Sequence, residues 1–186
     1  DFIKWRKYSL RRRVNPQFRK LLITMGGVDF NNITGQVLDI IKNCKLPKCL
    51  EIVVIMGAAA PHIETVNKQA KMMPYKTLVR SNVANMAEIM ADVDLAIGAA
   101  GTTTWERCCL GVPSIQMVLA NNQIEVAKKL DSVGASYYLE RIDWLCESID
   151  NLSRKMQKTI IITSSVTDGR GVDKVLSCMG QDCYSM

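Results

Sequence analysis

The sequence predicts an α/β domain in which a parallel β-sheet is covered by helices on both faces. Short, continuous apolar runs recur along the chain, each with the length of a strand that is buried on both sides. Most of these runs end in glycine or polar residues and are followed by apolar residues at helical spacing. This alternation of strands and helices is typical of a parallel sheet.

Six runs are predicted to be strands. They span residues 21–25, 51–56, 76–80, 94–97, 114–120 and 136–139. On the helix that follows the fourth strand, Trp105, Cys108 and Cys109 are expected to face inward. After the last strand, one helix is marked by Leu145, Ile149, Leu152 and Met156, and a closing helix should follow the turn at 168–171.

Length and composition indicate one domain with a real core. The chain has 186 residues, of which 48% are hydrophobic and 23% charged, which excludes a disordered or fibrous protein. It begins at Asp1 rather than at a methionine, so we expect a piece of a longer protein. Without a signal-peptide pattern or an apolar run long enough to span a bilayer, we expect a cytoplasmic protein with no stable membrane insertion.

Positive charge is concentrated at the start of the chain. The formal net charge is +6, and residues 1–20 hold eight Lys and Arg against one acid. We expect 1–20 to be a basic interdomain connection, either solvated or forming a helix packed beside a domain at 21–186. Because that domain is nearly neutral, its charge gives no argument for binding nucleic acid.

The seven cysteines do not form a metal-binding pattern. They are Cys44, Cys49, Cys108, Cys109, Cys146, Cys178 and Cys183. They form no C-x-x-C pair and the chain has a single histidine, so no metal site is predicted. The odd count and the adjacent pair indicate reduced thiols.

The segment from Gly98 to Glu106 predicts an anion site. It combines a turn of small residues with a helix start, whose first amides have no partner inside the helix. Thr102, Thr103 and Glu106 share one face of that helix, where a carboxylate can accept hydrogen bonds from a sugar diol. The alternative is a capping box between Thr103 and Glu106, which needs no ligand.

Polar or glycine-rich turns are expected at one edge of the sheet. They lie at residues 26–27, 81–85, 98–103 and 121–123, each after a predicted strand. Ligands of parallel α/β sheets bind at the carboxyl ends of the strands, so this convergence favours a binding site. His62, at the start of a helix after the second strand, is more typical of a structural than of a catalytic histidine.

Several of these segments resemble one enzyme family. They are MGGVDFNN at 25–32, NMAE at 85–88, AIGAAGTTTWER at 96–107, LANNQ at 119–123 and DGRG at 168–171. From about Leu21 onward the chain resembles the UDP-2,4-diacetamido-2,4,6-trideoxy-β-L-altropyranose hydrolases of pseudaminic acid biosynthesis. More distantly, it is similar to the Rossmann-like, C-terminal nucleotide-binding half of GT-B glycosyltransferases, especially the peptidoglycan N-acetylglucosaminyltransferase.

The resemblance implies a UDP-binding role for ten residues. Gly26 and Gly27 would line the pyrophosphate end, and the backbone near Val83 would contact the uracil. Ala100, Gly101, Thr102 and Thr103 would hold the diphosphate, Glu106 the ribose, and Asn122 and Gln123 the sugar or diphosphate. Many members of the family carry an acidic residue at the position of Asn121, so this chain departs from the pattern there.

The resemblance also implies a UDP-sugar hydrolase whose catalytic histidine lies in another, N-terminal domain. His62 does not match that motif, so we expect no catalytic residue in this chain and binding of UDP without turnover. No cofactor is implied. Two alternatives are the donor-binding domain of a GT-B glycosyltransferase and a non-enzymatic module that binds nucleotide sugars.

Overall fold

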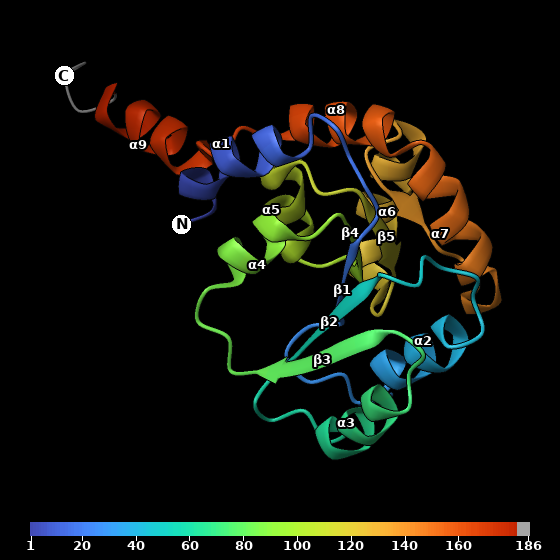
Figure 1. The fold of residues 1–186 in the computed structure, drawn as a ribbon. Helices are drawn as coiled ribbons and strands as arrows, with labels where there is room; N and C mark the ends of the chain where they lie inside the picture. Colours follow the sequence, from blue (N-terminus) through green and yellow to red (C-terminus); the bar gives the residue numbers. More distant parts are fainter. Residues whose placement is uncertain (182–186) are drawn as a thin grey trace.

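The structure, a computed structural model, describes residues 1–181 and contains a six-stranded sheet in that part of the chain (Figure 1). Its strands are β1 (Lys20–Thr24), β2 (Glu51–Met56), β3 (Lys76–Ser81), β4 (Leu95–Ala99), β5 (Ser114–Met117) and β6 (Tyr137–Tyr138). Every neighbouring pair is parallel and the order is β3-β2-β1-β4-β5-β6. The predicted parallel α/β fold is therefore confirmed.

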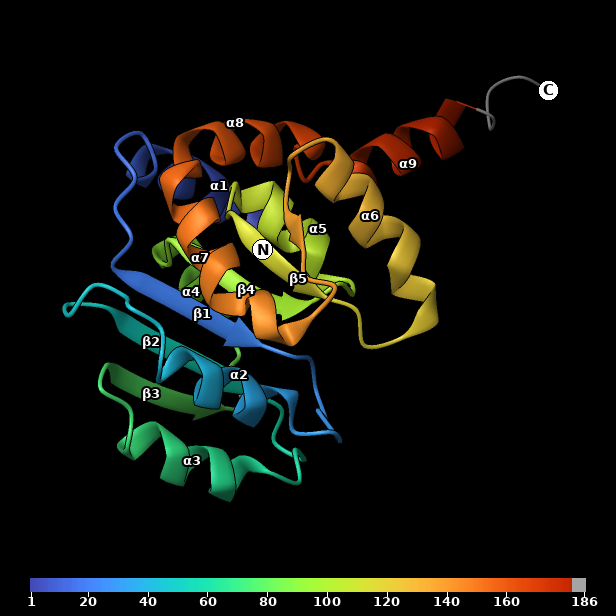
Figure 2. The ribbon, with the colours of Figure 1, turned by 90° about the vertical axis from the view of Figure 1, so that its right-hand side faces the viewer.

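The helices cover both faces of this sheet (Figure 2). They are α1 (Phe2–Arg12), α2 (Ile33–Ile41), α3 (Ile63–Lys71), α4 (Met86–Asp92), α5 (Thr103–Leu110), α6 (Ile124–Ser132), α7 (Leu145–Arg154), α8 (Met156–Val166) and α9 (Gly171–Gln181), with short 3₁₀ turns η1 (Asn121–Gln123) and η2 (Ile142–Trp144). In Figure 2, α2, α3 and α7 lie on the near face, whereas α1, α4 and α5 lie behind the strands.

Apolar side chains on both faces of the strands explain this two-sided arrangement. Leu21 and Ile23 of β1 belong to one buried cluster, and Leu22 between them belongs to a second cluster on the opposite face. Successive strand residues point to opposite faces, so a continuous apolar run buries both. Each fully buried side chain of this kind contributes about 1.5–3 kcal/mol.

Three details differ from the sequence predictions. The fifth strand ends at Met117 rather than at residue 120, because Met117 pairs with Ala99, the last residue of β4, and no strand lies beside the residues that follow. The single helix expected at 145–156 is two helices, since α7 packs against α2 and α8 packs against α5. Trp105 is 48% exposed and does not face inward, whereas Cys108 and Cys109 are buried as expected.

The basic leader forms a helix that is packed onto the domain. α1 lies against α4 and α5. Arg13 is only 2% exposed and donates to the carbonyl oxygens of Met90 (3.1 Å), Ala91 (3.0 Å) and Val93 (2.5 Å) at the end of α4. Of the two alternatives for residues 1–20, the structure therefore contains the packed helix. Burial lowers the pKa of Arg13 to about 10.

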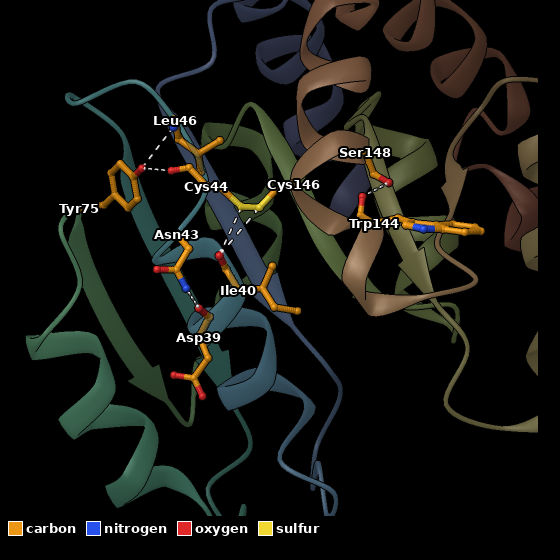
Figure 3. Close-up of a disulfide and its surroundings, with 9 residues drawn as sticks. All are labelled: Asp39, Ile40, Asn43, Cys44, Leu46, Tyr75, Trp144, Cys146 and Ser148. Carbon is orange, nitrogen blue, oxygen red and sulfur yellow. Dashed lines mark hydrogen bonds between the residues drawn. A yellow bond between two sulfur atoms is a disulfide. The ribbon is translucent and has the colours of Figure 1, made fainter.

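Two cysteines that we expected to be reduced form a disulfide (Figure 3). Cys44, after α2, is bonded to Cys146 in α7, 102 residues further along the chain. The expectation of reduced thiols is wrong for this pair because folding brings α2 and α7 together. Tyr75 holds the same loop, since its hydroxyl donates to the Cys44 carbonyl at 2.6 Å and accepts from the Leu46 amide.

Four further cysteines in the described part are free. They are Cys49, Cys108, Cys109 and Cys178, whereas Cys183 lies outside the described residues. Cys108 is 2% exposed, and burial raises the pKa of its thiol to about 11, so it remains a protonated, apolar core group at neutral pH. Within residues 1–181, no helix is both long and apolar enough to cross a membrane.

Candidate functional site

The strand order places a topological switch point between β1 and β4. These strands are neighbours, and Thr24 of β1 is in register with Gly98 of β4. The chain leaves β1 toward α2 on one face of the sheet and leaves β4 toward α5 on the other face. The two connections diverge, which is the arrangement that opens a ligand crevice at the carboxyl ends of strands in sheets of this order. The glycines at 26–27 and the turn at 100–103 lie in these two connections.

The start of α5 presents backbone amides that have no acceptor. Within the described residues, no hydrogen bond is made by the amides of Gly101, Thr102 and Thr103. Thr102 is the N-cap residue, and its side chain makes no capping bond. These amides point along the positive end of the helix dipole, so an anion is their natural partner. The Ala100 amide differs, because it donates to the Met117 carbonyl at 2.9 Å.

The helix start in the connection that follows β1 differs, because side chains cap it. Asp29 accepts from the amides of Ile33 and Thr34 at 2.8 and 2.9 Å, and Asn32 accepts from Gly35 at 3.2 Å. The start of α2 is therefore capped by its own side chains. This contrast indicates that an anion would bind at α5 rather than at α2.

Glu106 is not part of a capping box. The helix begins after Thr102, and in the described part of the chain the Glu106 carboxylate accepts no hydrogen bond from the helix start. It lines a hollow of about 310 Å³ together with Trp105, Phe2 and Gly169. Burial raises the pKa of Glu106, and the neighbouring Arg107 opposes that shift. Glu106 is therefore a carboxylate without a structural partner, one turn into the helix that carries the free amides.

Gln123 is also brought to this turn. Its Oε1 atom accepts from the Leu119 amide at 3.0 Å, which fixes the side chain. Its Nε2 atom lies 3.7 Å from the point where a Cβ on Gly101 would stand. Asn121 and Asn122 precede it in η1 and are exposed. Asn122 thus lies near the turn along the chain, without a contact that fixes its side chain.

Val83, Gly27 and His62 have other surroundings than the turn at 100–103. Val83 lines a different hollow of about 630 Å³ with Trp5 and Tyr8 of α1, so its side chain is not in the hollow that contains Glu106. Gly27 lies against the end of β2, because a Cβ on Gly57 would stand 1.7 Å from the Gly27 carbonyl oxygen. The His62 ring contacts the Phe30 carbonyl at 2.9 Å.

One charged residue of this region was given no role in the sequence interpretation. Arg107 is completely buried, with its guanidinium beneath the turn at 99–103. Its position beside Glu106 in the sequence gave no sign of this, since the two side chains leave α5 in different directions. Within the described residues, no group of three or more His, Cys, Asp or Glu side chains could hold a metal ion.

The fold and the turn at α5 together define a nucleotide-binding class of α/β domain. A parallel sheet of this order, with its switch point between β1 and β4 and free helix amides after β4, is the Rossmann type. Residues 20–163 match the Glycosyltransferase family 28 C-terminal domain, and the chain belongs to that family.

Individual relatives agree with this family assignment. The chain is 29% identical over 175 residues to the spore coat polysaccharide biosynthesis protein SpsG of Bacillus subtilis, covering 89% of this chain and 51% of that protein. It is 29% identical over 150 residues to the UDP-N-acetylglucosamine–N-acetylmuramyl-(pentapeptide) pyrophosphoryl-undecaprenol N-acetylglucosamine transferase of Halalkalibacterium halodurans, covering 75% and 40%. Among solved structures, MurG of Acinetobacter baumannii superposes with a TM-score of 0.79 at 17% identity, covering 97% of this chain and 55% of MurG.

These comparisons correct the expected activity. The matching family consists of glycosyltransferase domains, and the relative from Halalkalibacterium halodurans is a transferase. The identification as a UDP-sugar hydrolase is therefore wrong, and none of the relatives named above is described by pseudaminic acid. Short motifs led to it, because the turns that hold a nucleotide diphosphate do not specify what receives the sugar. The chain also spans only about half the length of the first relative.

Proposed function

We propose that this chain is the donor-binding domain of a GT-B glycosyltransferase and that it holds the UDP part of a nucleotide sugar. The observation that carries the proposal is the cluster of free amides at Gly101, Thr102 and Thr103, beside the switch point between β1 and β4. The family and the UDP-sugar transferase among the relatives support the choice of nucleotide.

In the proposed site, two groups on α5 bind different parts of the nucleotide. The amides of Gly101, Thr102 and Thr103 receive the diphosphate, and Gln123 Nε2 lies close enough to the turn to add a donor. The Glu106 carboxylate accepts hydrogen bonds from the ribose diol. Gly26 and Gly27 form the opposite wall, and Asn122 faces the sugar. In this proposal the nucleotide extends toward α4, where the backbone near Val83 contacts the uracil.

The chemistry that this domain contributes is stabilisation of the leaving group. When the sugar is transferred, negative charge builds up on the diphosphate of UDP. Fixed amides and the positive end of the α5 dipole lower the energy of that charge without reorganising. Because the relatives are about twice as long, we propose that the acceptor site and the remaining catalytic groups lie in another domain of the same protein.

The test is calorimetric titration of UDP and of uridine into the chain and two variants of Thr102. Thr102→Pro removes one donor amide at a position whose φ of −58° suits proline and whose amide has no acceptor in the described part. Thr102→Ala, the matched control, keeps that amide. Since a hydrogen bond to a charged group is worth about 1.5–3 kcal/mol, Thr102→Pro should bind UDP at least about tenfold more weakly.

Uridine binding distinguishes the contribution of the diphosphate to the affinity from that of the nucleoside. Both variants should bind uridine as the unmodified chain does, and Thr102→Ala should also keep its UDP affinity. The proposal is overturned if UDP does not bind at all. It is equally overturned if Thr102→Pro and Thr102→Ala bind UDP alike, because the amide would then not contact the phosphates.

A further inference from the structure

Arg107 is a buried cation whose hydrogen bonds all go to the turn before α5 and to the first turn of that helix. Its side chain runs back toward the start of α5, as side chains on a helix do. Nη2 donates to the Ala99 carbonyl at 2.9 Å and to the Thr104 hydroxyl at 3.0 Å, and Nη1 donates to the Thr103 hydroxyl at 3.1 Å. The residue is 0% exposed, and its Nε atom has no hydrogen-bond partner among residues 1–181.

The position of Gly98 shows how closely the guanidinium is fitted beneath the turn. A Cβ on Gly98 would lie 2.9 Å from Arg107 Nη1 and 2.7 Å from the Thr24 carbonyl oxygen. Only glycine leaves this space free. The guanidinium therefore lies at the carboxyl ends of β1 and β4, against the turn that carries the free amides.

The charge of Arg107 is not neutralised within the described part of the chain. No carboxylate there lies within ion-pair distance of it. The adjacent Glu106 carboxylate exerts only a through-space attraction on Arg107. Burial lowers the pKa of Arg107 to about 10, so the group is still protonated at neutral pH.

Arg13 is a useful comparison, because it is the other completely buried large cation of the core. Its guanidinium bonds carbonyl oxygens at the end of α4, where the helix dipole is negative, and Asp92 and Asp94 lie nearby. The Arg107 guanidinium lies instead at the positive end of α5. A buried cation in that place is unfavourable unless an anion binds beside it.

We propose that Arg107 is a positioning residue of the donor site, which holds the diphosphate-binding turn in shape and places a buried positive charge beneath the nucleotide diphosphate. This inference rests on the proposed function. The guanidinium fixes the Ala99 carbonyl and the hydroxyls of Thr103 and Thr104, so the free amides keep their direction. Its charge adds to the amides and the helix dipole in a region from which water is excluded.

The experiment measures the affinities of UDP, uridine and inorganic pyrophosphate for the full chain and for Arg107→Met, Arg107→Lys and Arg13→Met. Arg107→Met should bind UDP and pyrophosphate at least about tenfold more weakly, because a charged group near the phosphates is lost, and should bind uridine within about twofold. Arg107→Lys keeps the charge and should lose less. Arg13→Met, also a buried arginine, should leave the ratio of UDP to uridine affinity unchanged.

The ratio of UDP to uridine affinity separates this role from a purely structural one. The proposal is contradicted if Arg107→Met leaves UDP binding unchanged, or weakens UDP and uridine equally. If circular dichroism shows that Arg107→Met does not fold, Arg107→Lys decides. For Arg107→Lys, a loss of UDP affinity of about threefold or more at constant uridine affinity supports the role. A smaller loss of UDP affinity, or an equal loss of UDP and uridine affinity, overturns it.

Failure of the proposed function gives a different result. If the unmodified chain binds neither UDP nor uridine, the proposed function fails. Pyrophosphate then still tests the charge beneath the turn, since binding that is weakened by Arg107→Met supports an anion site there. Absence of pyrophosphate binding removes the inference together with the site.

Discussion

Two adjacent residues of α5 have opposite surroundings that suit opposite parts of a nucleotide. Arg107 is buried beneath the turn and bonded to it, whereas Glu106 lies in an open hollow with no hydrogen-bond donor from the described residues. Burial shifts the pKa of both groups toward their neutral forms. A ligand that brings phosphates to one and hydroxyls to the other would satisfy both.

The raised pKa of Glu106 predicts how UDP binding depends on pH. A protonated carboxyl accepts hydrogen bonds from a diol more weakly, so UDP affinity should fall as the pH is lowered toward the pKa of Glu106. Because burial raises that pKa above 4.5, the loss should begin at a higher pH than for an exposed glutamate. Calorimetry between pH 5 and pH 8 measures this effect.

Glu106→Gln isolates the contribution of this carboxylate. At pH 8 it should bind UDP roughly tenfold more weakly, since a charged hydrogen bond is lost. It should also lack the carboxylate-dependent part of the pH profile, leaving only the titration of UDP itself. Glu147→Gln, at an exposed position of α7, serves as the control. Parallel pH profiles for Glu106→Gln and the unmodified chain would rule out a ribose contact.

At the scale of elements, α1 is an integral part of the domain. The Arg13 guanidinium satisfies carbonyl groups at the end of α4, and Arg12 donates to Asp94, which also accepts from the amides of Arg19 and Lys20. Arg6 reaches the Ser164 carbonyl at the end of α8. The charge pattern predicted a basic leader. It could not reveal that these arginines donate hydrogen bonds to carbonyl oxygens at the ends of α4 and α8.

Removal of the Arg13 guanidinium should therefore destabilise the whole domain. Arg13→Met leaves several buried carbonyl oxygens without a donor, and each such loss costs about 1–3 kcal/mol. We expect the free energy of unfolding in urea to fall by about 3 kcal/mol. Arg11→Met, at an exposed position two residues before Arg13, should change it by less than about 0.5 kcal/mol. Equal effects of the two substitutions would contradict the role of Arg13.

The link between α2 and α7 gives a second prediction at this scale. The Cys44–Cys146 bond closes a loop of about 100 residues, so it should stabilise the fold by about 2–4 kcal/mol. Urea unfolding of the unmodified chain should show this difference between oxidised and reduced samples. Cys44→Ser should unfold alike in both conditions, whereas Cys49→Ser should behave as the unmodified chain. Detection of both thiols as free in the native, oxidised chain by mass spectrometry would exclude the bond.

For the whole molecule, the strands and the sheet edge that carries the turns could be predicted from local sequence patterns. The buried runs at β1, β2 and β4 need two covered faces, and parallel strands bring their carboxyl ends to one edge. The free amides of α5 could be expected from the small residues at 98–101 followed by threonines. These features depend only on neighbouring residues.

Features that depend on distant residues could not be predicted in the same way. The disulfide joins residues 102 apart, and the role of Gly98 becomes clear only when Thr24 and Arg107 are seen on either side of it. Val83 follows β3, the strand at the end of the sheet, and lines a different hollow from Glu106, so its contact with the uracil stays a prediction. The activity could be predicted least well, because it also depends on parts of the protein outside this chain, which covers about half of the first relative.

The central claim is that a nucleotide diphosphate binds to the amides at the start of α5. Titration of UDP into ¹⁵N-labelled chain, followed by amide chemical shifts, tests it most directly. We expect the largest saturable changes at Gly101, Thr102 and Thr103, with smaller changes at Gly26 and Gly27. Saturable binding that shifts other amides and leaves these three unchanged would contradict it.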